Sequence, residues 1–150
     1  MRMLATSATS VVMMCLLITG ALDRLTARQR ASTVVSLYTG TDGQTHDRVV
    51  NIELKPWPGA RSAERSDPIR SADVQYRRMP SGWANDWHPA PARQYVITLS
   101  GRGEIELIGG RKLDFGPGSV FLAEDLTGKG HVSRTIGSED WVSIAIRLSQ

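Results

Sequence analysis

Short runs of β-forming residues, each ending at a glycine-rich turn, dominate the chain from residue 33 onward. The run at residues 94–100 ends at Gly101-Arg102-Gly103, and the run at residues 104–107 is followed by Gly109-Gly110, a pair typical of a two-residue hairpin. In residues 104–107 glutamates alternate with apolar residues, which predicts that the glutamates lie on the solvent face. No later stretch keeps a helical period over three turns. About nine short strands joined by turns predict an antiparallel β-sandwich or barrel, and a barrel hides the sheet edges of a small domain.

The length and composition fit one globular domain. The chain has 150 residues, of which 41% are apolar and 22% charged, so it can bury a single core and does not have a disordered composition. Its net charge of +3 comes mainly from arginines that are scattered without a basic run, so we expect no nucleic-acid partner. The only cysteine is Cys15, which excludes an intrachain disulfide.

The N-terminus carries a short apolar run. Residues 11–18 are too few to span a bilayer, which takes about 20 apolar residues, but their number suits the core of a signal peptide. Small residues follow at Thr19-Gly20-Ala21, where a signal peptidase would cleave. We therefore expect a signal peptide at residues 1–21, an arginine-rich linker at 22–32 and a folded domain at 33–150. The protein would then be exported to the periplasm or secreted. The alternative is a cytoplasmic protein, and contact with a membrane would need the uncleaved segment as an anchor.

The segment from residue 87 to residue 135 resembles the two motifs of the cupin family. The first family motif has a His-x-His pair, a Glu three or four residues later, and a Gly after six more residues. Here His88 falls on the first His position and Ala90 on the second. Gln94 stands in place of the Glu, and Gly101 follows at the family spacing.

The second cupin motif combines a Gly, a strand, Pro-x-Gly-x-x-His and a later Asn. Here Gly118 precedes the strand, and residues 128–131 (GKGH) supply Gly-x-x-His. Leu126 replaces the Pro, Thr135 replaces the Asn, and two residues are inserted before Leu126. The resemblance implies a small single-domain cupin of the RmlC-like superfamily with degenerate metal-binding motifs. Its fold would be an all-β, cupin-type antiparallel β-barrel, or jelly roll, over residues 33–150.

The resemblance also implies a metal site inside the barrel. A cupin site usually offers three imidazoles and a carboxylate, a set that suits Fe, Mn, Ni, Zn or Cu. The implied ligands here are His88, Gln94 and His131, while His46 lies far from the motifs and is expected outside the barrel. The missing carboxylate would come from a loop residue that turns inward: Asp86, Glu124 or Asp125.

We expect His131 to be the catalytic acid–base group, because imidazole gains and loses a proton near neutral pH. Gln94 and the aromatic residues Trp87 and Tyr95 are expected to contact the substrate, with Trp83 as a further wall of the pocket mouth. Structural roles are the alternative for each residue. The aromatic side chains would then be core, Gln94 an ordinary strand residue, and the two motif histidines would only hold a rim and a turn.

Two functions remain open from the sequence. The first is a small-molecule-binding cupin that acts in its pocket as a metal-assisted isomerase, lyase or oxygenase. The alternative is a non-enzymatic barrel that binds or senses a small molecule and has lost its metal. The fold does not choose between an enzyme and a binding protein. A homodimer is compatible with either function, and the sequence does not indicate the substrate.

Overall fold

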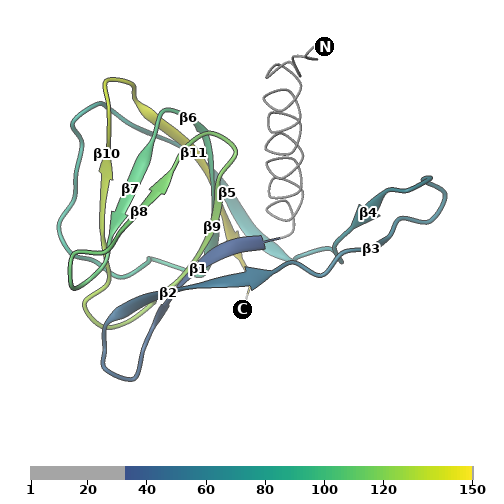
Figure 1. Cartoon of the computed structure of the whole chain (residues 1–150), viewed down its shortest axis with the longest axis horizontal. Coiled ribbons are helices and arrows are strands. Elements are labelled where there is room, and N and C mark those ends of the chain that lie inside the picture. Colours follow the sequence, from purple (N-terminus) through teal and green to yellow (C-terminus); the bar gives the residue numbers. More distant parts are fainter. Residues whose placement is uncertain (1–32, 150) are drawn as a thin grey trace, which may run out of the picture. The chain divides into compact units, whose positions relative to one another are not determined.

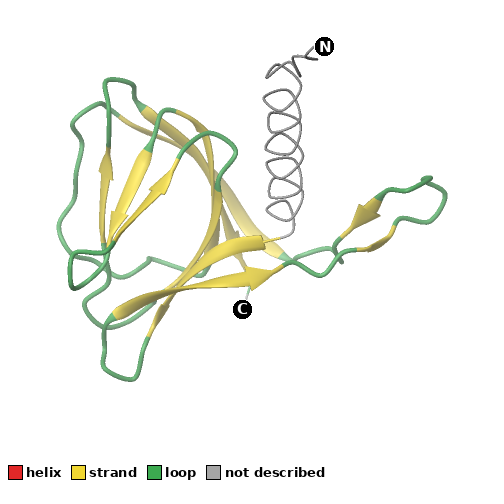
Figure 2. Ribbon diagram, in the orientation of Figure 1, coloured by secondary structure: helices red, strands yellow, loops and turns green. Residues whose placement is uncertain are grey.

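The computed structural model describes residues 33–149, and all of the regular secondary structure in this range is β-strand (Figures 1 and 2). The predicted signal peptide and linker, residues 1–21 and 22–32, lie outside the described residues. Between residues 33 and 149 no helix has the length and apolar character needed to cross a membrane. The strands are β1 (Thr33–Thr39), β2 (Thr45–Asn51), β3 (Lys55–Pro56), β4 (Glu64–Arg65), β5 (Ser71–Met79), β6 (Gln94–Ser100), β7 (Gly103–Glu106), β8 (Lys112–Phe115), β9 (Val120–Glu124), β10 (Val132–Thr135) and β11 (Trp141–Leu148).

Two sheets form the body of the domain. The larger has the strand order β2-β1-β9-β6-β11-β5, and the smaller has the order β10-β7-β8. Figure 1 shows the large sheet curving around one side of the domain, with the small sheet opposite its concave face. The β3–β4 pair forms a separate hairpin that projects away from both sheets (Figure 1). The predicted all-β class is confirmed.

One detail of the predicted antiparallel barrel is wrong. Strand β1 pairs with β9 in parallel, with Val35 opposite Phe121 and Leu37 opposite Ala123, so the large sheet is mixed. Parallel neighbours need a long connection between them. Here the chain passes through seven intervening strands, β2 to β8, before it returns beside β1. Sequence patterns identify individual strands but do not identify such a distant partner.

The small sheet gains an edge from the segment that precedes β6. Isolated bridges join Ala84 to Arg134 and His88 to His131, both antiparallel. The segment that carries the first cupin-like motif therefore runs alongside β10, next to the second motif.

The core lies between the two sheets, where β11 contributes Trp141 and Ala145 and the small sheet contributes Ile105, all at most 3% exposed. Because side chains alternate along a strand, the intervening residues of the large sheet point to its outer face. That outer face is also apolar, with a second cluster of Val34, Leu122 and Leu148. An apolar side chain on the large sheet therefore does not by itself identify the inner face.

Candidate functional site

A cavity of about 320 Å³ opens between the two sheets, and the three predicted ligands His88, Gln94 and His131 all line it. His88 comes from the edge segment, Gln94 from the start of β6, and His131 from the residue before β10. The other lining residues come mainly from the concave face of the large sheet and from the first-motif segment: Arg77, Met79, Trp83, Asn85, Pro89, Ala90, Pro91, Val96, Phe121, Ala123, Ser133, Trp141 and Ser143.

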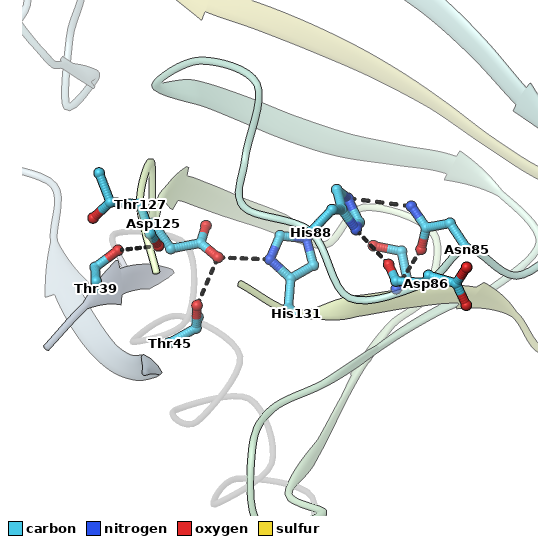
Figure 3. A network of polar contacts seen from close by, with 9 residues as sticks. Thr39, Thr45, Asn85, Asp86, His88, Asp125, Thr127 and His131 are labelled. Carbon is cyan, nitrogen blue, oxygen red and sulfur yellow. Dashed lines mark hydrogen bonds and ion pairs between the residues drawn. The ribbon is translucent and has the colours of Figure 1, made fainter. Parts of the chain in front are cut away.

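Backbone pairing holds the two motif histidines together. The N–H of His88 donates to the carbonyl of His131 at 3.0 Å, and the N–H of His131 donates back to the carbonyl of His88 at 2.9 Å. Their ring centroids are 4.7 Å apart, with a tilt of 57° between the ring planes. Figure 3 shows the two imidazoles side by side.

His131 forms a buried pair with Asp125. Its Nδ1 lies 2.7 Å from Asp125 Oδ2, which also accepts a hydrogen bond from the Thr45 hydroxyl at 2.9 Å (Figure 3). Asp125 is 0% exposed and His131 is 5% exposed. Because a carboxylate only accepts, Nδ1 carries the proton in this pair and Nε2 is left as the other ring nitrogen. Asp125 is therefore the acidic neighbour that turns inward, whereas Glu124 binds Ser36 and two arginines instead.

The ring of His88 is held by residues of its own loop, on the side away from Asp125 and His131. Its Nδ1 donates to the Asp86 carbonyl at 2.9 Å, and its Nε2 accepts from the Asn85 amide at 3.2 Å (Figure 3). The Asn85 amide cannot be reversed, because its Oδ1 accepts the Ser133 N–H at 2.9 Å. Both ring nitrogens of His88 are thus engaged within the protein.

The side chain of Gln94 contacts the guanidinium group of Arg77. The Nη2 of Arg77 on β5 donates to Gln94 Oε1 at 2.9 Å and to Gln75 Oε1 at 2.9 Å. Gln94 is 4% exposed. Burial lowers the pKa of the Arg77 guanidinium below its ordinary value, and the nearby charge of Arg147 lowers it further.

These donors do not fit the metal that the cupin resemblance implies. The oxygen of Gln94 already accepts from a guanidinium, and the Nε2 lone pair of His88 already accepts from Asn85. Among residues 33–149 no group of three His, Cys, Asp or Glu side chains is placed to hold a metal ion. A metal at Gln94 would also stand against the positive charge of Arg77.

Two predicted substrate contacts lie outside the cavity. Tyr95 packs in the outer apolar cluster, because it follows Gln94 on β6 and so points to the other face of the sheet. Trp87 is 44% exposed on its loop and is not part of the lining. Trp83 does line the cavity. His46 is also outside, at the start of β2, where it contacts Asp42 at 3.0 Å.

Arg77 and Ser143 line the cavity although sequence reasoning did not identify them. The pattern of β5 is misleading, since its apolar residues Val74 and Tyr76 are 62% and 70% exposed while Arg77 points inward. Hydrophobic alternation would place Arg77 on the solvent face. No signal in the sequence identifies these two residues without knowledge of the strand pairing.

The two segments that resemble the cupin motifs lie side by side, joined through the backbones of His88 and His131. No protein-family model matches the chain, and no curated protein matches it. Similar solved structures include the cupin domain of Schizosaccharomyces pombe Cnp3, with 14% identity, a TM-score of 0.42, and coverage of 79% of this chain and 85% of that chain. Protein NMB1881 from Neisseria meningitidis has 11% identity and a TM-score of 0.41 over 59% of this chain and 90% of that one.

Proposed function

We propose that the protein binds a small organic molecule in the cavity between its sheets and that His131 exchanges a proton with it. The observation that carries this proposal is the buried Asp125–His131 pair at the cavity wall. A buried carboxylate loses its hydration, so such a group is retained at a cost in free energy. By holding the proton on Nδ1, Asp125 makes Nε2 of His131 the basic nitrogen, as in other Asp–His pairs that transfer protons.

The cavity suits a small molecule. Its volume of about 320 Å³ is at the lower end of the range for ligand pockets, which runs from roughly 300 to 1,000 Å³. Apolar side chains form much of its wall, including Met79, Val96 and Phe121. A few polar groups interrupt this wall, which is the usual composition of a pocket that both binds and orients a ligand.

Isomerisation or a lyase step is the reaction class that this site supports. Both need a proton to be removed from carbon or delivered to it, which a single positioned imidazole can do. No hydrogen bond engages Nε2 of His131 within residues 33–149, so this nitrogen is available to a ligand. The neighbouring imidazole of His88 has both nitrogens engaged and would act only as a wall.

Binding can be tested with a small ketone and a small keto acid, such as cyclohexanone and 4-oxopentanoate. The readout is the fluorescence of the cavity tryptophans Trp83 and Trp141. Ala90→Leu would fill part of the cavity and should abolish the response. Ala92→Leu, two residues on and outside the lining, is the matched control. The binding proposal fails if no compound changes the fluorescence, or if the two variants respond alike.

Proton transfer has a separate readout. In D2O the wild-type protein should accelerate deuterium incorporation next to the carbonyl of a bound ketone, and His131→Gln should remove that acceleration. His46→Gln, which changes an exposed histidine, should leave it unchanged. Binding without accelerated exchange would instead identify a non-enzymatic binding barrel.

A further inference from the structure

Arg77 is a cavity-lining guanidinium whose hydrogen bonds go to neutral groups. Its contacts are with the amide oxygens of Gln75 and Gln94, and within residues 33–149 it forms no ion pair with a carboxylate. Asp73, the nearby acid on the same strand, pairs with Arg147 at 3.3 Å. In the part of the chain that the structure describes, no aspartate or glutamate lines the cavity. The wall therefore carries one fixed positive charge that no acidic lining residue balances.

An anion in the cavity would complete this arrangement. A charged group that is moved out of water needs an opposite charge or several hydrogen bonds in compensation. Burial and the nearby charge of Arg147 lower the pKa of Arg77, while the charge of Asp73 on the same strand acts in the opposite direction and raises it. An arginine remains charged in proteins even so.

Further hydrogen-bond donors lie beside Arg77 on neighbouring strands. Ser143 is directly opposite Arg77 in the β11–β5 register. Its hydroxyl is buried and has no hydrogen-bond partner among residues 33–149, although Ser143 also lines the cavity. Gln94 on β6 presents its oxygen to Arg77, so its NH2 group points elsewhere and can donate.

We propose that the ligand of this cavity is a small carboxylic acid whose carboxylate is bound by Arg77, Ser143 and Gln94. This rests on the proposed function and assigns its substrate class. A planar carboxylate matches the fork of guanidinium donors, and one negative charge balances the one fixed positive charge of the wall. A phosphate would bring a second charge, for which the lining offers no second arginine or lysine among the described residues. The apolar wall residues would cover the rest of the acid.

The test compares matched probes that differ only in charge: benzoate with benzamide, and hexanoate with hexanamide. Binding is measured by titration calorimetry at low salt on the full chain, and each carboxylate should bind at least tenfold more tightly than its amide. Arg77→Gln should weaken carboxylate binding at least tenfold and leave amide binding unchanged. Arg78→Gln is the control, because Arg78 is the next residue on β5, is exposed and pairs with Asp140 outside the cavity.

The outcomes separate this inference from the proposed function. Equal affinity for carboxylates and amides in the wild-type protein would overturn the carboxylate assignment and leave cavity binding standing. Failure of every probe to bind would overturn both. The wild-type comparison does not depend on how well Arg77→Gln folds, and Ser143→Ala gives a second variant that keeps the charge. Unchanged carboxylate affinity in both variants would also refute the assignment of Arg77 and Ser143 as carboxylate-binding residues.

Discussion

His88 and His131 are directly opposite each other in a two-residue bridge, and each donates its backbone N–H to the carbonyl of the other. The pairing brings the two cupin-like motifs together through backbone hydrogen bonds, with no need for a shared ligand between the rings. The site geometry is therefore a property of the folded chain. A change that separates these two backbones should disturb the cavity even when no cavity side chain is altered.

Gly130 permits this close approach. Its φ is +72°, and a Cβ at this position would lie 1.9 Å from the His88 carbonyl oxygen. Gly130→Ala should therefore lower the free energy of unfolding by about 2–4 kcal/mol through the clash and the unfavourable φ together. Gly118→Ala is the control, because Gly118 has a φ of +81° with open space around its Cβ position, and it should cost about 1 kcal/mol. Urea unfolding gives the free energy of unfolding of both variants. An equal loss of stability in the two variants would contradict the proposed close contact at Gly130.

Removing His131 alone should leave the Asp125 carboxylate buried without its main partner. Leaving a buried charge without its partner typically costs about 3–5 kcal/mol, so we expect a loss of this size in His131→Ala. Asp125→Asn in the same chain removes the unpaired charge and should recover a large part of the loss. Thermal and urea unfolding of the single and double variants measure the recovery. A double variant that is no more stable than His131→Ala would mean that Asp125 is not charged in the folded protein.

Glu124 should make stability depend on pH in the acidic range. Burial raises its pKa, but hydrogen bonds from Ser36, Arg93 and Arg48 outweigh it, and the pKa is lowered from the ordinary value of 4.5. A pKa that is lower in the folded state means that the carboxylate stabilises the fold above about pH 4.5 and loses this effect as the pH falls through the folded value.

The variant Glu124→Gln should therefore be less stable than the wild-type protein by about 1–2 kcal/mol at pH 7. The difference should shrink as the pH is lowered below 4.5, because the wild-type carboxylate then takes up a proton. Urea unfolding at pH 7, 5 and 3.5 gives the three differences. Glu64→Gln on the exposed β4 strand is the control for a general charge effect. A difference that stays constant across this range would refute the assignment.

Much of the fold follows from local patterns. The predicted run at residues 94–100 is β6, and Glu104 and Glu106 lie on the outer face of the small sheet, while Ile105 and Leu107, which alternate with them, are buried. These features depend on alternation and turn residues, which act over a few neighbouring positions. The parallel β1–β9 pair depends on contacts between distant residues, and no local pattern specifies it.

The site was only partly predictable for the same reason. The motif spacing predicts His88, Gln94 and His131 as site residues, and all three line one cavity. Tyr95 was misplaced because β6 carries apolar residues on both faces. The inward orientation of Arg77 is not predictable from the pattern of β5, because Arg77 alternates with exposed apolar residues, which reverses the usual pattern. Such a reversal becomes visible only when the partner strands are known.

Thr98 should control the position of Trp141 in the cavity wall. The Trp141 indole donates to the Thr98 hydroxyl at 3.0 Å, and that hydroxyl donates to the Phe115 carbonyl at 3.3 Å, with Thr98 only 1% exposed. Thr98→Val keeps the side-chain shape but leaves the indole N–H without its acceptor, which should cost about 1–3 kcal/mol of stability. Because Trp141 lines the cavity, its fluorescence response to bound compounds should also change. Thr41→Val, at an exposed position, is the matched control, and equal behaviour of the two variants in unfolding and fluorescence would show that the Thr98 hydroxyl does not hold the indole.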